Sequence, residues 1–393
     1  MEKPRVYAAS VEEIVGGEAT DIYFVRTRRI VEEAGLGDVR VRMEVHAYSL
    51  PKGYEWAVFA GLEEALAILE GKDVTVYSVP EGTIFYRKEP LMIIEGRYAD
   101  FATLETAILG VLRFASTIAT AAARMRKLAG DKTLLYFGLR ALHPAVYPAA
   151  DRAAYIGGVD GVSGVLAEKY LGVEPKGTMP HALIIVFGDQ VEAWKWFAKL
   201  YGDRVPVIAL VDTFLDERVE SLMAAEALGE KLYGVRLDTP SSRRGRMKDI
   251  VEEVRWTLKM KGYGHVKIFV SGGIGEEQIR ELRDVVDGFG VGTSISSAPN
   301  IDISMDIVEV NRGGGWERVS KRGKLPGAKL LYRCPDGTRL VTLLGEEPPK
   351  CRSGVEAELL TWKIMEHGRL LEPLPSIEEI RGYVLRQLES VDL

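Results

Sequence analysis

Cysteine is nearly absent from this chain: only Cys334 and Cys351 occur among 393 residues. Two thiols exclude a disulfide-rich secreted scaffold, which carries four or more cysteines in a short chain. A structural zinc site would need four ligands, commonly from two Cys-x-x-Cys pairs. Gly337 and Pro348 stand where the second cysteine of each pair would be. We therefore expect no zinc, and leave two free thiols and a mutual disulfide as alternatives.

Amide side chains and long apolar runs are scarce as well. Three Gln and two Asn stand against 51 Lys+Arg and 57 Asp+Glu, a balance typical of proteins from thermophiles. No apolar run approaches the roughly 18 residues of a membrane span. The first residues, MEKPRVYAAS, lack the apolar centre of a signal peptide. The sequence predicts a cytoplasmic protein of a thermophile, without a membrane partner.

A surplus of positive charge is missing too. The formal net charge is −6 and the isoelectric point about 5.7, with both signs interspersed. A nucleic-acid surface would show a basic stripe, so we expect no nucleic-acid partner. The hydrophobic share of 47% and charged share of 27% are those of a globular protein with a large core. At this length two or three domains are expected.

Both ends of the chain contain strand-like stretches together with a helical stretch. Residues 1–100 mix apolar, strand-like stretches with a helical stretch at Ala60 to Leu69, which predicts a small α+β domain with an antiparallel sheet. The expected strands cover Val39 to Ala47, Val74 to Val79 and Leu91 to Ile94. Residues 306–393 are strand-like and rich in glycine, then close with a helix at Ser376 to Leu388. We expect this tail to pack on the N-terminal domain.

The middle, residues 101–305, has a different pattern. Residues 101–130 place apolar side chains at helical spacing and form a helical lead-in. Short apolar runs then alternate with helices, and this alternation predicts βαβ units and a parallel sheet. The runs are LLYFG, YIGG, VPVIALVDT, YGVRLD, VKIFVSGG and VDGFGVGT. Polar or glycine residues close successive strands, which favours an irregular (β/α) barrel over a doubly wound sheet with one crevice.

Two glycine-rich turns follow late strands of this alternation, in VSGGIGEEQI (270–279) and VDGFGVGTSIS (286–296). Glycine lets backbone N–H groups approach a phosphate closely, and late barrel strands commonly end at a phosphate site. Plain tight turns use glycine too, but two in succession favour phosphate binding. The predicted phosphate and ribose site comprises Ser271, Gly272, Gly273, Gly290, Gly292 and Thr293.

Charged residues end two further strands. In GVRLDT (234–239) Arg236 and Asp238 are two apart, so both point to one side of the strand. They can bind an anionic substrate and ribose hydroxyls or Mg²⁺, or simply form a salt bridge at the barrel rim. LVDTF (210–214) places Asp212 at another strand end.

Three more residues are candidates for the site, and each also has a purely structural explanation. LYFGLRALH (135–143) places Phe137 and Arg140 near a strand end, where one could be a core residue and the other a surface residue. GTMPHA (177–182) places His181 after a proline, in a segment resembling a loop that enters a site. A lone histidine is more often structural than catalytic.

Taken together, these segments resemble the nicotinate phosphoribosyltransferases, of an archaeal type, from about residue 15 to 330. The matching motifs follow one another in the family's order and are TDIYFVRT (20–27), FASTIATAAAR (114–124), FGLR, YIGGVDG, GTMPHA, VDT, GVRLD, SGGI, GVGTS and RGKLPGAK (322–329). The resemblance implies a type II phosphoribosyltransferase barrel. It further implies formation of nicotinate mononucleotide from nicotinate and phosphoribosyl pyrophosphate, in NAD salvage.

The resemblance also implies roles for the binding residues. Nicotinate would stack between Phe137 and the Tyr23 of a neighbouring subunit, and Arg140 would pair with its carboxylate or with a phosphate. Arg236 and Asp238 would contact the phosphoribosyl group. Asp160 of YIGGVDG joins the phosphate and ribose set, in which the backbone of the glycine turns would hold the 5′-phosphate.

His181 matches the histidine that the family phosphorylates from ATP, and Asp212 is a reasonable orienter of its ring. The resemblance implies ATP as co-substrate, Mg²⁺ near Asp212 and Asp238, and a homodimer or larger homo-oligomer. The tail resembles a zinc-knuckle region but keeps only half of its cysteines. Quinolinate or nicotinamide phosphoribosyl transfer, or a non-catalytic phosphate-binding barrel, are the alternatives.

Overall fold

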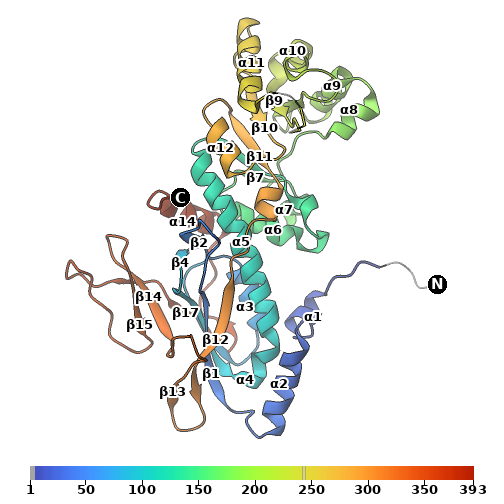
Figure 1. Ribbon diagram of the computed structural model, residues 1–393. Coiled ribbons are helices and arrows are strands. Elements are labelled where there is room, and N and C mark those ends of the chain that lie inside the picture. Colours follow the sequence, from blue (N-terminus) through green and yellow to red (C-terminus); the bar gives the residue numbers. More distant parts are fainter. Residues whose placement is uncertain (1–4, 241, 244) are drawn as a thin grey trace. The chain divides into compact units, whose positions relative to one another are not determined.

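The computed structural model describes residues 5–240, 242–243 and 245–393 (Figure 1). The chain forms two compact units: a sheet unit, which runs up to Thr120 and resumes over Pro299–Leu393, and a barrel unit, Ala121–Ala298. The divisions at 120/121 and 298/299 compare with predicted boundaries at 100/101 and 305/306. The first falls inside one long helix, α5 (Glu105–Ala129).

Segments from both chain ends pair in the sheet unit. Its main antiparallel sheet has the strand order β13-β12-β1-β5-β3-β17-β18 among the described residues. The bounds are β1 Arg40–Ala47, β3 Val74–Ser78, β5 Pro90–Arg97, β12 Ile303–Asn311, β13 Trp316–Arg318, β17 Trp362–Glu366 and β18 Arg369–Leu370. β1 lies between β5 and β12, so Ala47 of the N-terminal segment pairs with Ile303 of the C-terminal segment in one ladder.

The core of this unit lies under that sheet. The apolar face of α3 (Leu62–Leu69) and residues Ile108 and Leu112 of α5 are buried with the inward side chains of β1, β3 and β5. Removing such a large apolar surface from water is the main stabilising contribution. Around it lie α1 Val11–Val15, α2 Ile22–Glu33, α4 Tyr98–Phe101, the 3₁₀ turn η1 Ala102–Leu104, α14 Ile377–Leu388 and the antiparallel pair of β2 Trp56–Val58 and β4 Ile84–Tyr86.

A disulfide joins Cys334 to Cys351 in the tail. It staples the small sheet of β14 (Lys329–Arg333), β15 (Arg339–Leu343) and β16 (Glu358–Leu359), and both cysteines are buried. Of the two alternatives that the sequence left, the mutual disulfide is the one found, and neither sulfur remains as a free thiolate.

The small sheet of β14, β15 and β16 is called the ribbon below. We expect the Cys334→Ala/Cys351→Ala double variant to lose about 3 kcal/mol of stability in this ribbon, since the bridge closes a loop of 17 residues in the unfolded chain. Hydrogen exchange over residues 329–359 would measure the loss. The amides of β1 and β5 serve as the internal control. Equal protection of the ribbon in wild type and variant would contradict the expectation.

One helical stretch in the described chain, Tyr98–Ala129, is long and apolar enough to cross a membrane by length and composition, with a mean hydropathy of 1.5 in its best window. It contains no long uninterrupted apolar run, because Gly, Ser, Thr and a few charged residues are interspersed. Of that window 56% is buried inside the structure. A core helix of a soluble protein has the same properties, so the stretch is weak support for a membrane span.

The barrel unit contains a curled parallel sheet, an open half-barrel with strand order β7-β6-β11-β10-β9-β8 among the described residues (Figure 1). The predicted irregular barrel is confirmed. The strands are β6 Thr133–Tyr136, β7 Gly161–Val162, β8 Val207–Leu210, β9 Leu232–Leu237, β10 Lys267–Val270 and β11 Gly288–Val291. No pairing of β7 with β8 occurs in the described chain.

Helices connect these strands. They are α6 Tyr147–Ile156, α7 Ala167–Leu171, α8 His181–Phe187, α9 Gln190–Tyr201, α10 Glu217–Leu228, α11 Met247–Met260, α12 Glu276–Leu282 and α13 Thr293–Ser296, with 3₁₀ turns η2 Leu139–Ala141, η3 Pro144–Val146 and η4 Gly229–Lys231. The predicted strand at YIGG was wrong. Tyr155 and Ile156 end α6, because the apolar pair belongs to the buried face of that helix, and Gly157 and Gly158 form the turn into β7.

Candidate active site

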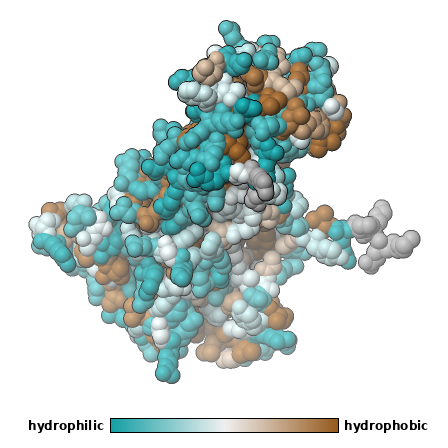
Figure 2. All heavy atoms as spheres, turned by 45° about the horizontal axis from the view of Figure 1, so that its top comes forward, coloured by the Kyte–Doolittle hydropathy of each residue, from teal (hydrophilic) through white to brown (hydrophobic). Residues whose placement is uncertain are grey.

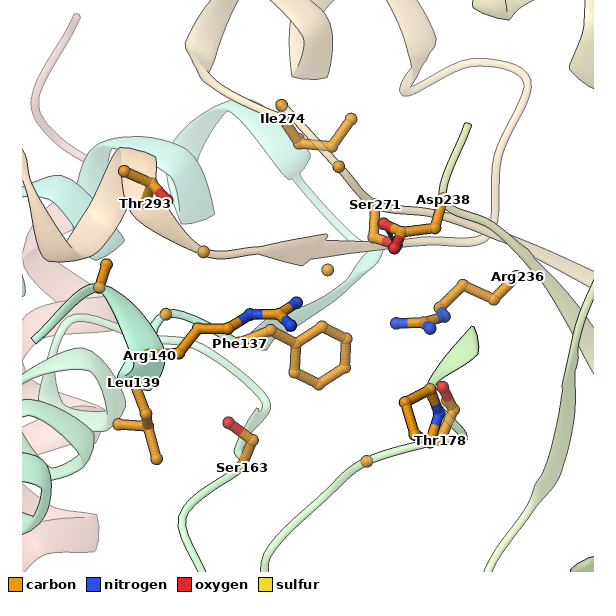
Figure 3. Close-up of a pocket in the computed structure, with 18 of the residues that line it drawn as sticks. Phe137, Leu139, Arg140, Ser163, Thr178, Arg236, Asp238, Ser271, Ile274 and Thr293 are labelled. Atoms are coloured by element: carbon orange, nitrogen blue, oxygen red, sulfur yellow. Dashed lines mark hydrogen bonds between the residues drawn. The ribbon is translucent and has the colours of Figure 1, made fainter. Parts of the chain in front are cut away.

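A cavity of about 680 Å³ lies in the barrel unit, where the carboxyl ends of the strands meet. Residues after β6, β9, β10 and β11 line it together with the segment that enters α8 (Figure 3). Most of the predicted site residues share this one cavity, although they are spread over more than 150 positions of the sequence. They are Phe137, Arg140, His181, Arg236, Asp238, Ser271, Gly272, Gly273, Gly290, Gly292 and Thr293.

The turn after β10 presents backbone N–H groups to the cavity. Gly272 and Gly273 both have positive φ, +79° and +67°, a conformation that costs glycine little. Among the described residues, no hydrogen bond uses the N–H of Gly272, Gly273 or Ile274. Successive free N–H groups in such a turn form a concave binding place for an anion.

Gly290 has a second reason to be glycine. A Cβ there would lie 2.6 Å from two ring carbons of Phe137. The missing side chain therefore lets the aromatic ring lie against β11, at the floor of the cavity. The sequence predicted only a phosphate role for this residue.

Two guanidinium groups approach the Phe137 ring, as Figure 3 shows. The Cζ atom of Arg236 lies 6.0 Å from the ring centroid, and its Nη2 donates to the Met179 carbonyl at 2.9 Å. Its Nε is buried without a partner among the described residues. Burial lowers the pKa of Arg236, the carboxylates of Asp238 and Asp212 oppose this, and the charge of Arg140 adds to it. The cavity thus has a cationic wall with an unused donor.

His181 and the carboxylates of Asp212 and Asp238 form a second polar cluster. Its Nε2 lies 3.0 Å from Oδ1 of Asp212, and its Nδ1 lies 3.9 Å from Oδ2 of Asp238. Oδ2 of Asp212 accepts the Asp238 N–H at 2.7 Å, and Ser271 Oγ donates to Asp238 Oδ1 at 2.7 Å. The orienting contact proposed for Asp212 is therefore present. Burial raises the pKa of Asp212, opposed first by the charge of His181.

Three predicted residues are not among those that line this cavity: Asp160, Tyr23 and Asp212, of which Asp212 contacts the lining residue His181. The Asp160 carboxylate accepts hydrogen bonds from Arg126 at 2.6 Å and from the Leu134 N–H at 2.9 Å, which ties α5 to β6. That placement argues against phosphate or ribose binding, because these donors already hold the carboxylate beside β6. Tyr23 lies on α2 of the sheet unit and is 56% exposed. Its contact with a second subunit stays a prediction.

Several lining residues were not predicted from the sequence, Thr178 above all. Its Oγ1 is buried with no partner in the part of the chain that the structure describes. Ser163 and Lys176 also line the cavity. Thr178 stands in the GTMPHA string, three residues before His181, and its position in a Gly/Pro-rich loop was the available signal.

The carboxylates fit a substrate-borne Mg²⁺ better than a resident one. Among the described residues, no group of three or more His, Cys, Asp and Glu side chains is placed to hold a metal. Both oxygens of Asp212 are engaged, whereas Asp238 keeps a partly exposed oxygen toward the cavity. Mg²⁺ in proteins is often held by one carboxylate and substrate phosphates, which is the arrangement that Asp238 allows.

Asp151 of α6 lies buried beside the cavity wall. Burial raises its pKa to about 7, opposed by the Gly164 N–H, and Oδ1 has no hydrogen-bond partner in the described chain. Between about pH 4 and 7 the folded form keeps a proton that the unfolded form has lost, so the free energy of unfolding falls as the pH rises. A neutral isostere removes this penalty.

We therefore expect Asp151→Asn to be more stable than wild type at pH 8, by about 4 kcal/mol, and equal to it near pH 4. Urea unfolding at both pH values measures the difference. Asp160→Asn is the control with the opposite sign, because it removes a paired carboxylate. A stabilisation of Asp151→Asn that is the same at both pH values would contradict the assignment.

Two domains of one known protein family match most of this chain. Residues 118–306 match the quinolinate phosphoribosyl transferase C-terminal domain, and residues 21–116 match the N-terminal domain of that family. The nicotinate phosphoribosyltransferase of Mycobacterium tuberculosis is 28% identical over 403 aligned positions, covering 97% of this chain and 84% of that protein. The Bacillus subtilis enzyme of the same name is 27% identical over 80% of this chain and 72% of its own length.

Two solved structures are similar to this chain over nearly its whole length. The nicotinate-nucleotide pyrophosphorylase of Pyrococcus furiosus is 50% identical, with a TM-score of 0.95 and complete coverage of both chains. Human nicotinic acid phosphoribosyltransferase has a TM-score of 0.79 at 24% identity, over 94% of this chain and 93% of its own, which shows the shared fold. The chain therefore belongs to the nicotinate phosphoribosyltransferase family and is a phosphoribosyltransferase of pyridine-nucleotide biosynthesis.

Proposed function

We propose that the protein transfers phosphoribose from phosphoribosyl pyrophosphate to nicotinate, with ATP hydrolysed through a phosphohistidine. The observation that carries the proposal is the pair of unused polar atoms beside Phe137, namely Arg236 Nε and Thr178 Oγ1. A buried cation and a hydroxyl next to an aromatic face suit an aromatic ring that bears a carboxylate. Buried polar atoms without partners in a cavity are where a ligand's complementary groups bind.

Nicotinate stacks on Phe137 and directs its carboxylate to Arg236 and Thr178. This refines the expectation from sequence, in which Arg236 served the phosphoribosyl group. Arg140, exposed and on the turn after β6, takes the phosphate side of the substrate. A charged carboxylate gains more from a desolvated guanidinium than a neutral amide does, so nicotinamide is the poorer substrate.

Phosphoribosyl pyrophosphate, with its Mg²⁺, binds with the 5′-phosphate on the free N–H groups of Gly272 and Gly273. Asp238 faces the ribose, where its carboxylate stabilises the positive charge that develops at C1′ as pyrophosphate leaves. The Ser271 hydroxyl holds that carboxylate in place. The pyridine nitrogen then forms the new bond to C1′.

His181 is the acceptor of the ATP γ-phosphoryl group. Its Nε2 is held by Asp212, so Nδ1 keeps the lone pair that faces the cavity beside Asp238. Nδ1 attacks the γ-phosphorus, the bond to the bridging oxygen breaks, and ADP leaves. Asp212 stabilises the ring as it becomes positively charged.

Quinolinate transfer is the second candidate, because the 50% identical Pyrococcus furiosus protein bears the name nicotinate-nucleotide pyrophosphorylase. Quinolinate carries a second carboxylate and needs a further cation near the ring. Arg140 and Lys176 are the lining residues that could supply it, but Arg140 is exposed and serves the phosphate side, and Lys176 is half-exposed with its Nζ 3.0 Å from Glu174. The cationic groups of the cavity therefore favour a substrate with one carboxylate, nicotinate, over quinolinate with two.

We also propose a cytoplasmic homo-oligomer. Figure 2 shows apolar side chains gathered over α8 and α9, at the upper right of the view. The exposed members on these helices are Ile185, Val186, Phe187, Trp196, Leu200 and Tyr201. Contiguous exposed apolar surface is typical of a protein interface. Light scattering after size exclusion would reveal a monomer if this part of the proposal is wrong.

One assay tests the central proposal. The protein is incubated with phosphoribosyl pyrophosphate, Mg²⁺ and nicotinate, nicotinamide or quinolinate, each with and without ATP, and the mononucleotides are separated. We expect nicotinate mononucleotide, formed to a higher yield with ATP. Product from quinolinate alone would establish the second candidate, and no product from any substrate would leave a non-catalytic barrel.

A further inference from the structure

A buried arginine of α5 contacts the segment that carries the free N–H groups of the cavity. Arg124 ends the string FASTIATAAAR, and its side chain is 6% exposed. Its Nε donates to Oε1 of Glu276 at 2.6 Å, and its Nη2 donates to Oε2 at 3.0 Å. Two parallel charge-assisted bonds between planar groups fix both distance and orientation. Arg124 does not itself line the cavity, so its effect on the site passes through the residues that it contacts.

Glu276 is the first residue of α12 and comes directly after the turn that follows β10. At the other end of that turn, the Ser271 N–H donates to the Leu237 carbonyl at 2.9 Å. Between the two ends, Gly272 and Gly273 have positive φ. Glycine restricts its own backbone least of all residues, so the shape of the turn depends on how its ends are held. The hydrogen bond to β9 holds the first end, and the ion pair of Glu276 holds the second.

Apolar packing alone does not set the direction in which α12 leaves the turn. Ile279 and Leu282 are buried and hold the helix on the barrel unit, but apolar burial has no preferred direction. The Gly275 N–H is bonded to the Gln278 side chain of α12 itself, which does not tie the helix to its surroundings. The ion pair with Arg124 joins the start of α12 to the long helix α5, and so holds it at a defined place.

The same contact compensates a negative charge that follows the proposed phosphate site in the chain. α12 begins with two carboxylates, those of Glu276 and Glu277. An unpaired carboxylate beside the free N–H groups would repel a phosphate and compete for their hydrogen bonds. Arg280 also approaches Glu276, but its Nη2 is 3.7 Å from Oε2 and its side chain is half-exposed. Arg124 therefore supplies the closer and more buried positive charge.

We infer that Arg124 is a positioning residue: its two-point ion pair with Glu276 holds the turn after β10 in the conformation that binds the 5′-phosphate. Without the pair, one end of the turn is released, and ligand binding then includes the cost of ordering the turn. That this turn binds the 5′-phosphate of phosphoribosyl pyrophosphate rests on the proposed function, whereas the dependence of the turn on Arg124 does not.

Replacing Arg124 by methionine removes the ion pair and keeps most of the apolar volume. We expect the KM for phosphoribosyl pyrophosphate to rise about 10-fold, while kcat and the KM for nicotinate stay within about 2-fold. Arg126→Met is the matched control. Arg126 lies two residues further along α5, has a side chain 9% exposed, and pairs with Asp160 at 2.6 Å, which ties α5 to β6. This variant should lose similar stability but keep the wild-type KM for phosphoribosyl pyrophosphate.

A double-mutant cycle separates the ion pair from unrelated effects. Glu276→Gln should raise the same KM. The double variant Arg124→Met/Glu276→Gln should raise it no further than the larger of the two single changes, because both remove one contact. Multiplied effects in the double variant would overturn the inference, as would an unchanged KM in Arg124→Met or an equal rise in Arg126→Met.

Hydrogen exchange tests the role of Arg124 without reference to activity. Over residues 270–282 we expect faster exchange in Arg124→Met than in wild type, and exchange at the wild-type rate in Arg126→Met. Equal exchange over this segment in all three proteins would overturn the inference. Calorimetric binding of ribose 5-phosphate separates the inference from the proposed function. If the wild type does not bind this probe, the phosphate assignment of the turn fails, while hydrogen exchange still decides whether Arg124 holds the turn.

Discussion

Replacing Arg236 by alanine is expected to lower kcat/KM for nicotinate about 10³-fold, since truncating one partner of a buried charge pair costs about 4 kcal/mol. Arg236 supplies a desolvated cation with an unused Nε beside Phe137, and alanine leaves the substrate carboxylate without a partner. Steady-state kinetics with nicotinate varied, and calorimetric binding of nicotinate, would measure the effect.

Arg140→Ala is the matched control. It removes a guanidinium from the same cavity, but an exposed one on the phosphate side. We expect its main effect on the KM for phosphoribosyl pyrophosphate, with nicotinate binding changed only a few-fold. The reverse outcome, in which Arg140→Ala loses nicotinate and Arg236→Ala loses phosphoribosyl pyrophosphate, would exchange the two assignments.

Replacing His181 by alanine is expected to abolish nicotinate-stimulated ATP hydrolysis while ATP-independent transfer continues. The imidazole supplies the nucleophile for the γ-phosphoryl group, and no other histidine lines the cavity in the described chain. The residues around the nicotinate ring are untouched, so nucleotide still forms from phosphoribosyl pyrophosphate. Acid-labile phosphate on the protein after incubation with labelled ATP reports the intermediate directly.

Asp212→Asn refines this experiment. The amide keeps the shape of the side chain but holds the ring without a charge, so ATP hydrolysis should fall by about 10²-fold and not to zero. Equal ATP hydrolysis in wild type and His181→Ala would remove the histidine from the mechanism. Loss of ATP-independent transfer in His181→Ala would instead give it a role in the transfer step.

Local patterns in the chain predicted a large part of the site. Strand-ending residues in a parallel sheet gather at one edge, whatever their separation in sequence. Arg236, Asp238 and Ser271 can therefore be assigned to one cavity from the sequence alone. One of the predicted residues meets a partner that is distant in sequence. Asp160 follows the same kind of turn, yet its carboxylate meets Arg126 of α5, a partner 34 residues away that no local pattern shows.

By itself, the sequence determined the strand and helix alternation of the barrel unit, the glycine turns and the family, because these depend on periodicity and on residue types at short spacing. Tertiary structure alone decided which polar atoms are left without partners. Thr178 Oγ1 and Arg236 Nε become candidate ligand contacts only because burial removes water from them. Likewise, Cys334 and Cys351 pair, and Arg124 meets Glu276, because folding brings distant segments within bonding distance.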